Sequence, residues 1–379
     1  MSVIKQCLVS HTLLLITMLV APFSVLAEES KFNMPRGVTE ISEEVYDIHM
    51  LVFYICCVIG IAVFAVMFYS LLKHRKSVGA VPSQFHDNTA VEIIWTLVPT
   101  LILVLIAVPA TKTLLKIEVD READMSIKVT GWQWKWQYEY LDEDISFFSN
   151  LSEASNQARQ RASGIDPSTV ENYLLDVDNP VVIPVNTRVR FLVTSADVIH
   201  SWWVPALGWK QDAIPGFINT AWTEVKEPGI YRGQCAELCG KDHGYMPVVL
   251  EAKSQADYAE WVKEQQRKQE EAMLASGRDW SMDELMSRGE KIYTANCAAC
   301  HQANGEGIGM FPALKGSPVA TQGSVEEHTK LVLNGLNAMP AFGAQLNDAD
   351  IAAIVTYERN AWGNDVGDMI QPSAVKALR

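Results

Sequence analysis

Two long apolar runs near the amino terminus each predict a membrane-spanning helix. Positions 50–72 carry no charged residue over 23 positions, which is long enough to cross ~30 Å of hydrocarbon. A second uncharged run, 93–111, contains two prolines but keeps a spanning length. A buried helix of a soluble protein is the alternative for each run. We predict spans at about 48–72 and 93–113, within an amino-terminal segment covering 28–120.

The first 27 residues have the three parts of a secretory signal peptide. Lys5 supplies a positive charge, an apolar stretch follows at 13–20, and Ala27 ends a small-residue motif before an acidic segment. A retained membrane anchor is the alternative, although the apolar stretch is short. We predict cleavage after Ala27, so that two spans return everything beyond Lys112 to the exported side.

Short alternating runs replace the long ones between positions 121 and 251. Segments 126–130, 181–185 and 188–194 alternate apolar with polar residues, and glycines and prolines separate such segments. This spacing favours an antiparallel β sandwich or barrel. A polar stretch at about 149–172 interrupts the pattern and is interpreted as a surface insertion.

The carboxyl-terminal third predicts helices. Positions 252–275 are highly charged and free of glycine and proline, which favours an exposed helical linker within 252–280. Ser281 begins a capped amphipathic helix, and a last helix follows position 342. We therefore predict a separate domain at 281–379.

The charge balance is acidic. Asp and Glu number 45 against 31 Lys and Arg, for a net charge of −14 over 379 residues. This argues against nucleic acid as a partner, because nucleic-acid binders present basic surfaces. The same charge suits attraction of a basic protein partner, although simple solubility explains it equally well.

The seven cysteines are too clustered for a disulfide scaffold. Apart from Cys7 they occur as close pairs, at 56 and 57, at 235 and 239, and at 297 and 300. Pairs at short fixed spacing indicate metal or haem chemistry.

One loop combines four metal-binding side chains within twelve residues, namely Cys235, Cys239, His243 and Met246. His200 adds a second imidazole from a predicted strand end. Sulfur and imidazole donors of this kind select copper over hard cations. Two thiolates can bridge two copper ions, each completed by one histidine and a weak axial donor, either Met246 or the Glu237 carbonyl. A Cys235–Cys239 disulfide and a zinc site are the alternatives.

The motif Cys297-x-x-Cys300-His301 is typical of c-type haem attachment. Its two cysteines would form thioethers, and the histidine would be the proximal iron ligand. Met339 lies in a loop before the last helix and is the predicted sixth ligand, with Met310 as its rival. Because haem is attached in this way outside the cytoplasm, the motif also places both metal-binding regions on the exported face.

Residues ~40–250 resemble subunit II of the haem–copper cytochrome c oxidases. The resemblance rests on both spans, the aromatic block at 131–140, His200 and the whole loop from 235 to 246. It implies an all-β cupredoxin-like domain at 121–251 that holds the dinuclear copper centre CuA. The ligands it implies are His200, Cys235, Glu237 through its backbone carbonyl, Cys239, His243 and Met246.

The same resemblance implies three further roles. The Glu237 side chain would help bind Mg²⁺ or Mn²⁺ at the contact with the catalytic subunit. Trp134 would be the point at which electrons reach CuA, although Lys135 stands where many relatives have an aromatic residue. Glu92 would lie at the opening of the proton pathway called the K channel. Compensation of a helix dipole is the alternative role for this carboxylate.

Residues 281–379 resemble a small all-α class I cytochrome c domain. The two resemblances together imply subunit II of a caa3-type cytochrome c oxidase, a proton-translocating respiratory enzyme that reduces O2 to water in a partner subunit. Its copper and haem c would relay electrons from a cytochrome c or another periplasmic donor to catalytic subunit I. The complex would lie in the lipid of the bacterial inner membrane.

Three other functions were weighed against this one. A quinol oxidase subunit II lacks the copper ligands, which are all present here. A membrane-anchored copper chaperone would need neither the haem motif nor the aromatic block. A CuA and haem c subunit of a nitric oxide reductase-like complex is the remaining alternative, and the hairpin residues from Glu92 to Pro99 favour the oxidase over it.

Overall fold

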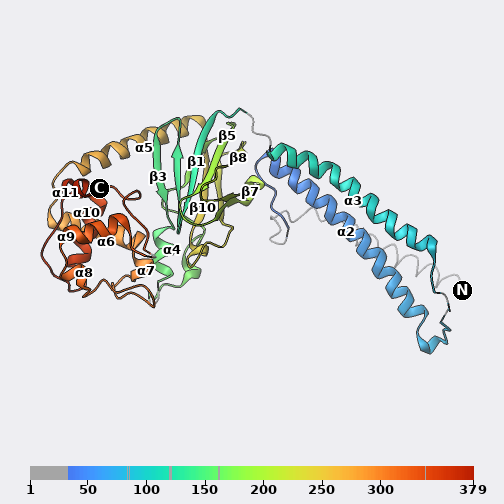
Figure 1. The fold of residues 1–379 in the computed structure, drawn as a ribbon. Helices are drawn as coiled ribbons and strands as arrows, with labels where there is room; N and C mark the ends of the chain where they lie inside the picture. The colour runs from blue at the N-terminus through green and yellow to red at the C-terminus, as the bar shows by residue number, and fades with distance from the viewer. Residues whose placement is uncertain (1–32, 83, 85, 119–121, 161–162, 338) are drawn as a thin grey trace. The chain divides into compact units, whose positions relative to one another are not determined.

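The computed structural model describes residues 33–82, 84, 86–118, 122–160, 163–337 and 339–379 (Figure 1). The predicted signal peptide, 1–27, lies outside the described residues. The chain divides into two units, 1–36 and 37–379. All of the elements described below belong to the second unit.

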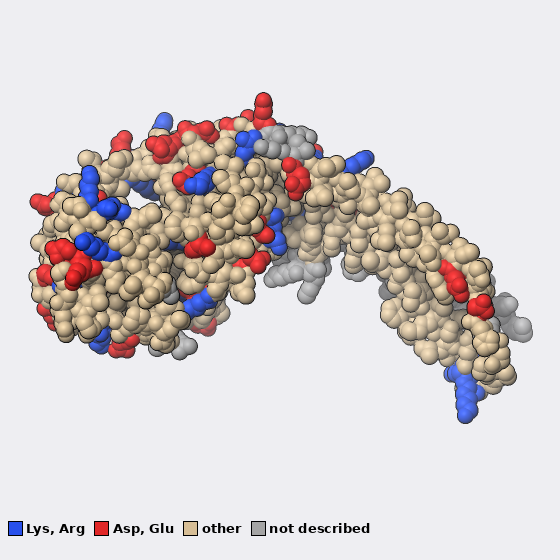
Figure 2. Space-filling view, in the orientation of Figure 1, with Lys and Arg blue, Asp and Glu red and all other residues tan. Residues whose placement is uncertain are grey.

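Two long apolar helices, α2 (Glu40–Lys73) and α3 (Thr89–Glu118), form a hairpin (Figure 1). Both are long and apolar enough to cross a membrane, and their apolar windows are not buried in the protein. Figure 2 shows few charged side chains along the middle of these helices. The two predicted apolar helices are confirmed, and each extends beyond its predicted span at both ends. The short helix η1 (Lys76–Val78) lies between them.

The exported end of the hairpin is fixed by polar contacts. Thr39 and Ser42 form a capping box at the start of α2, and the Thr39 hydroxyl also donates to the Leu207 carbonyl at 2.9 Å. Near the end of α3, Lys116 lies 2.7 Å from the Glu44 carboxylate. The first backbone N–H groups of a helix need partners outside the helix, and the capping box supplies them here. The contacts with Leu207 and Lys116 join α2 to the following domain and to α3.

Within the described residues, ten strands form two five-stranded sheets. The first has the order β3-β2-β1-β5-β8 and the second β4-β10-β9-β6-β7. The strands are β1 (Met125–Trp132), β2 (Lys135–Tyr140), β3 (Ile145–Ser149), β4 (Val181–Pro184), β5 (Val189–Ser195), β6 (His200–Val204), β7 (Trp209–Ala213), β8 (Asn219–Thr223), β9 (Gly229–Cys235) and β10 (Pro247–Lys253).

The two sheets form the predicted sandwich rather than a closed barrel. Most neighbouring strands are antiparallel, as expected, but β1 pairs with β5 and β4 with β10 in parallel. Parallel pairs need long crossover connections, and the alternation of residues within one strand carries no information about them. The cupredoxin-like all-β architecture is confirmed.

Aromatic side chains fill the space between the sheets. Trp202 of β6 stacks on Phe191 of β5 with ring centroids 5.1 Å apart, and its indole N–H donates to the Tyr138 hydroxyl. The Tyr140 hydroxyl donates to the Val182 carbonyl at 2.8 Å and so links the sheets. Each buried ring stabilises the fold by about 1.5–3 kcal/mol, which makes this core a rigid support for the loops at its end.

The predicted insertion and linker both contain helices. The insertion holds α4 (Glu153–Ala158) and the short helix η2 (Pro167–Thr169). The linker forms α5 (Gln255–Ser276), capped by Ser254. Tyr258 and Trp261 of α5 pack against the sandwich core. The first turns of the linker are therefore part of the sandwich domain, a contact that its high charge did not suggest.

The carboxyl-terminal region is helical, as predicted. Its helices are α6 (Met282–Asn296), α7 (Ala298–His301), α8 (Pro318–Thr321), α9 (Val325–Asn334), α10 (Asp348–Asn360) and α11 (Pro372–Leu378). Ser281 and Glu284 form the capping box that begins α6. Helices α6 and α10 cross closely at Gly289, where a Cβ atom would overlap the Ala353 carbonyl. This crossing holds the segment after α6 in place.

Candidate metal and haem sites

The copper-type loop is held between two paired strands. Cys235 ends β9, and His200 begins the neighbouring strand β6. The two strands are antiparallel, with Trp202 opposite Cys235. The Ala236 amide continues this pairing by donating to the Ser201 carbonyl at 3.0 Å. The start of one strand and the end of the other therefore lie side by side.

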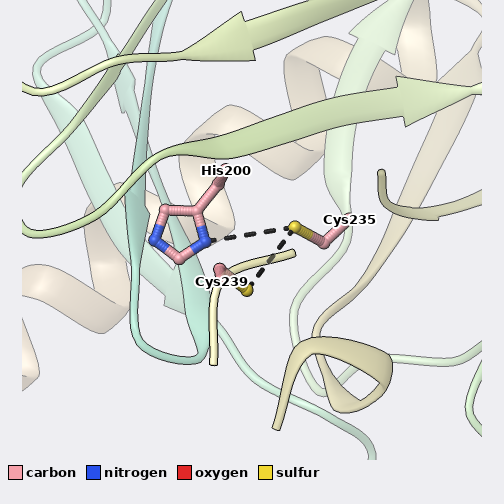
Figure 3. Close-up of side chains that lie close together, drawn as sticks. All are labelled: His200, Cys235 and Cys239. Carbon is pink, nitrogen blue, oxygen red and sulfur yellow. Dashed lines mark hydrogen bonds between the residues drawn. The ribbon is translucent and has the colours of Figure 1, made fainter. Parts of the chain in front are cut away.

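The structure brings together all six ligands that the resemblance implied. The Cys235 Sγ lies 3.8 Å from the Cys239 Sγ and 4.0 Å from His200 Nδ1 (Figure 3). The Cys239 Sγ lies 3.5 Å from both His243 Nδ1 and Met246 Sδ. The Glu237 carbonyl is 3.4 Å from the Cys235 Sγ. The short helix η4 (His243–Tyr245) carries the second histidine.

This donor set fits a dinuclear copper centre better than the alternatives. The sulfur separation is far longer than the ~2.05 Å of a disulfide. A structural zinc ion takes four ligands, whereas six donor atoms converge here. One histidine and the carbonyl oxygen lie near the Cys235 sulfur, and the other histidine and the thioether lie near the Cys239 sulfur. That symmetry provides one imidazole and one weak donor for each of two bridged ions.

The two thiols titrate as a pair in the metal-free protein. A hydrogen bond from Cys239 lowers the pKa of Cys235, and His200 adds to this effect against the opposing effect of burial. The same interaction, together with burial, raises the pKa of Cys239. Copper bridging needs both thiolates, so metal uptake must displace a proton from the second thiol.

Asp197 orients His200 and was not assigned a role from the sequence. Its carboxylate lies 2.9 Å from His200 Nε2, which leaves Nδ1 directed toward the Cys235 sulfur. The same carboxylate accepts a hydrogen bond from the backbone N–H of Gln133 at 2.7 Å. The sequence signal for this contact was the spacing Asp-x-x-His. That spacing indicates a contact between the two side chains only once the turn after β5 is known.

Replacing Asp197 with asparagine is expected to weaken copper binding by about 10- to 100-fold. Loss of a carboxylate that fixes a histidine ligand has effects of that size, because the ring orientation and basicity change. Competition with a copper chelator would measure the affinity. Replacing the exposed Asp212 with asparagine is the control. Equal chelator resistance in the Asp197 variant and the wild type would show that this carboxylate does not position the ligand.

Trp134 lies directly against the copper loop. Its indole N–H donates to the Cys239 carbonyl at 3.2 Å, and the Gln133 side-chain amide donates to the same oxygen at 2.9 Å. Gly240 has φ +116°, and a Cβ there would lie 3.2 Å from the Trp134 ring. The glycine therefore permits this close approach of ring and loop.

A cavity of about 850 Å³ lies beside the Cys-x-x-Cys-His motif. Cavities of this size hold cofactors. Its lining includes Cys297, Cys300, His301 and Met339 as well as Trp134. The two cysteines are free thiols. The cavity lining thus contains two thiols, an imidazole and a thioether. The thiols provide the covalent attachment points of a c-type haem, and the imidazole and thioether provide its axial ligands.

The imidazole of His301 is already oriented for an axial role. Its Nδ1 lies 2.8 Å from the Pro312 carbonyl, which leaves Nε2 for iron. Such outer contacts fix the tautomer of histidine ligands. Met339 is partly buried against the helical core, whereas the side chain of Met310 is 81% exposed. The geometry favours Met339 as the second axial ligand.

The remaining predicted residues lie at surfaces. Glu92 is in the first turn of α3 and its side chain is exposed on the hairpin. The Glu237 side chain is also exposed, at the tip of the copper loop beside Leu238, which is 78% exposed. Both carboxylates are exposed, so both depend on partners for any role.

Comparison with known families supports this assignment region by region. Residues 27–113 match the family "Cytochrome C oxidase subunit II, transmembrane domain". Residues 125–253 match "Cytochrome C oxidase subunit II, periplasmic domain". Residues 284–357 match "Cytochrome C oxidase, cbb3-type, subunit III". The periplasmic-domain family implies copper at the loop, and the third family implies haem c at the Cys-x-x-Cys-His motif.

Individual relatives extend the match across most of the chain. The cytochrome c oxidase subunit 2 of Alkalihalophilus pseudofirmus is 32% identical over 330 residues, which are 83% of this chain and 86% of the relative. The probable subunit 2 of Rickettsia prowazekii is 42% identical over 239 residues, covering 62% and 72%. The crystallised periplasmic domain of subunit II from Bradyrhizobium japonicum is 40% identical, covers 40% of this chain and 99% of its own, and gives a TM-score of 0.34. The chain belongs to the cytochrome c oxidase subunit II family and carries a carboxyl-terminal cytochrome c domain.

Proposed function

We propose that this chain is the subunit of a caa3-type cytochrome c oxidase through which electrons enter, and that they pass from its haem domain to its CuA domain. The position of Trp134 is the observation that carries the proposal. Its ring lines the haem cavity, while its indole N–H bonds to the carbonyl of Cys239. One side chain therefore adjoins both predicted redox sites.

Each predicted ligand has a role within this proposal. Haem c and the copper pair, when bound, supply one-electron oxidation and reduction. Cys297 and Cys300 would hold the haem covalently, and His301 and Met339 would be its iron ligands. In the loop, Cys235 and Cys239 would hold the copper pair. His200, the Glu237 carbonyl, His243 and Met246 complete the set. The rigid sandwich beneath the loop limits movement of these ligands when the charge changes.

The exposed tip of the copper loop is the proposed contact with the catalytic subunit. Glu237 and Leu238 project there next to a ligand, and Ile199, which precedes His200, is 46% exposed. Exposed apolar side chains around a redox site are typical of a protein contact. We propose that the Glu237 carboxylate binds Mg²⁺ or Mn²⁺ across this contact, because carboxylates suit hard cations.

The membrane and the electron donor complete the proposal. The apolar faces of α2 and α3 contact lipid of the bacterial inner membrane, with both metal domains in the periplasm. The donor is a cytochrome c or another periplasmic redox protein, which the acidic net charge of −14 would attract if it is basic. The partner subunit reduces O2 to water and pumps protons.

The acceptor specificity of the purified complex tests this function. We expect rapid consumption of O2 with reduced cytochrome c as donor, and much slower consumption of NO under anaerobic conditions. Faster turnover with NO than with O2 would instead identify the complex as a nitric oxide reductase.

Replacing Glu92 with glutamine is expected to slow steady-state O2 consumption severalfold. The substitution keeps size and hydrogen bonding but removes titration at the cytoplasmic end of α3, where we propose that protons enter. Intramolecular electron transfer to CuA should be unchanged. Replacing Asp87, in the loop before α3, with asparagine is the control. Unchanged turnover of a fully assembled Glu92 variant would leave only the helix-dipole role.

A further inference from the structure

The haem-attachment segment is held from three directions by the copper domain. This segment, Thr294–Ala299, comprises the end of α6 and the start of the Cys-x-x-Cys motif. It contacts Asn156 of the insertion, Lys135 at the start of β2 and Lys241 of the copper loop. The contacts fall within six consecutive residues that surround Cys297.

The insertion supplies the first contact through a connected chain of side chains. Asn156 of α4 is buried, and its amide donates to the Thr294 carbonyl at 2.8 Å. Its Oδ1 accepts from Arg159 Nε at 2.8 Å. Arg159 in turn forms a 3.0 Å ion pair with Asp242, and both side chains are largely buried. The chain of contacts thus runs from the copper loop through α4 to the haem-attachment segment.

Lysine side chains supply the other two contacts. Lys135 Nζ donates to Asn296 Oδ1 at 3.2 Å and lies over the Phe342 ring of the haem domain, 5.5 Å from its centroid. Burial lowers the pKa of Lys135 to about 8, because the buried position disfavours the charged amine. Lys241 Nζ donates to the Ala299 carbonyl at 3.0 Å and lies over the Phe311 ring at 4.7 Å. Both lysines therefore interact with the haem domain through a hydrogen bond and an aromatic face.

We propose that the insertion at 149–172 is a docking element, whose helix α4 acts with Lys135 and Lys241 to hold the haem domain over Trp134. This inference rests on the proposed electron route. It adds that transfer occurs in one docked arrangement, and not by repeated encounters of a tethered domain. It also assigns a purpose to Lys135 in place of an aromatic residue, because an amine can reach the Asn296 side chain.

The contacts explain why a tether alone is insufficient. The helix α5 has 22 residues, or about 33 Å at 1.5 Å per residue. A tether of such length raises the effective concentration of the haem domain only to the millimolar range. Docking contacts next to Cys297 fix which edge of the cavity faces Trp134. Because Trp134 is half-buried and lines the haem cavity, we expect an external donor to deliver its electrons to the haem domain.

Hydrogen exchange of the full chain tests the docking without relying on turnover. We expect the peptide that contains 294–299 to exchange about tenfold faster in the double variant Asn156→Ala, Lys241→Ala, since each hydrogen bond contributes modestly to docking. The exposed Gln157, whose side-chain amide donates to Glu153 within α4, provides the control variant Gln157→Ala. Exchange in the control should equal that of the wild type. The single variant Lys241→Ala, at an exposed position, serves if the double variant fails to fold.

Flash reduction of the same proteins gives the second readout. We expect the electron transfer from haem to copper to slow about tenfold in the double variant and to become dependent on solvent viscosity, because docking then limits the rate. Unchanged exchange and an unchanged, viscosity-independent rate would overturn the docking role. Absorption and EPR spectra of both metal sites separate this outcome from failure of the proposed function, in which those signatures are missing in the wild type as well.

Discussion

Replacing Cys235 with serine is expected to abolish the dinuclear copper centre. The Cys235 and Cys239 sulfurs lie 3.8 Å apart and are the only pair of donors in the described loop that can bridge two ions. A serine hydroxyl is a hard and weak copper ligand. Without the second bridge, the unpaired electron of the mixed-valence state cannot be shared equally. We expect loss of at least one copper ion per chain and a localised EPR signal.

The control for this variant is Cys57→Ser in the membrane helix α2. Cys57 is a free thiol remote in sequence from the loop, so copper content and spectrum should be unchanged there. The assignment of Cys235 as a ligand would be refuted by two coppers per chain with the hyperfine pattern of a shared electron. Covalent haem content should be normal in both variants, since the Cys-x-x-Cys-His motif is intact.

Replacing Met339 with histidine is expected to lower the reduction potential of the haem on the order of 0.1 V or more, within the ~0.8 V span that axial ligands control. A thioether ligand raises the potential of a c-type haem, and imidazole removes that effect. Covalent attachment should persist through Cys297 and Cys300. A haem at lower potential would transfer electrons onward more readily but accept them less readily from the donor.

Met310→His is the matched control for the axial ligand. The Met310 side chain is 81% exposed, so its replacement should leave the haem potential and the weak methionine-to-iron absorption band unchanged. The reverse pattern, an unchanged potential in the Met339 variant and a lowered one in the Met310 variant, would assign the ligand to Met310.

Local patterns were sufficient to predict the elements and most of the candidate site. The uncharged runs predicted α2 and α3 because a span needs only length and the absence of charge. The loop from Cys235 to Met246 was recognised because its four donor side chains are close in sequence. His200 is 35 residues from Cys235; its place at a predicted strand end made it a candidate, and the family resemblance implied its role as a ligand.

Features set by distant contacts could not be predicted. The pairing of β1 with β5 in parallel depends on crossovers between segments far apart in the chain. The role of Asp197 depends on a turn that brings it to His200 Nε2, and that of Pro312 on the loop after α7. The contact of Asn156 with Thr294 joins residues 138 positions apart. A polar insertion gives no sequence signal for such a partner.

Stopped-flow reduction of the full chain, followed at the haem c and CuA absorption bands together, tests the relay most directly. With a reduced periplasmic cytochrome as donor, the account predicts that the haem is reduced first. Copper should follow in a second phase whose rate does not change with protein concentration. Reduction of copper at an undiminished rate in a Cys297→Ser, Cys300→Ser, His301→Ala variant that lacks haem would contradict this relay, because electrons would then reach CuA without the haem.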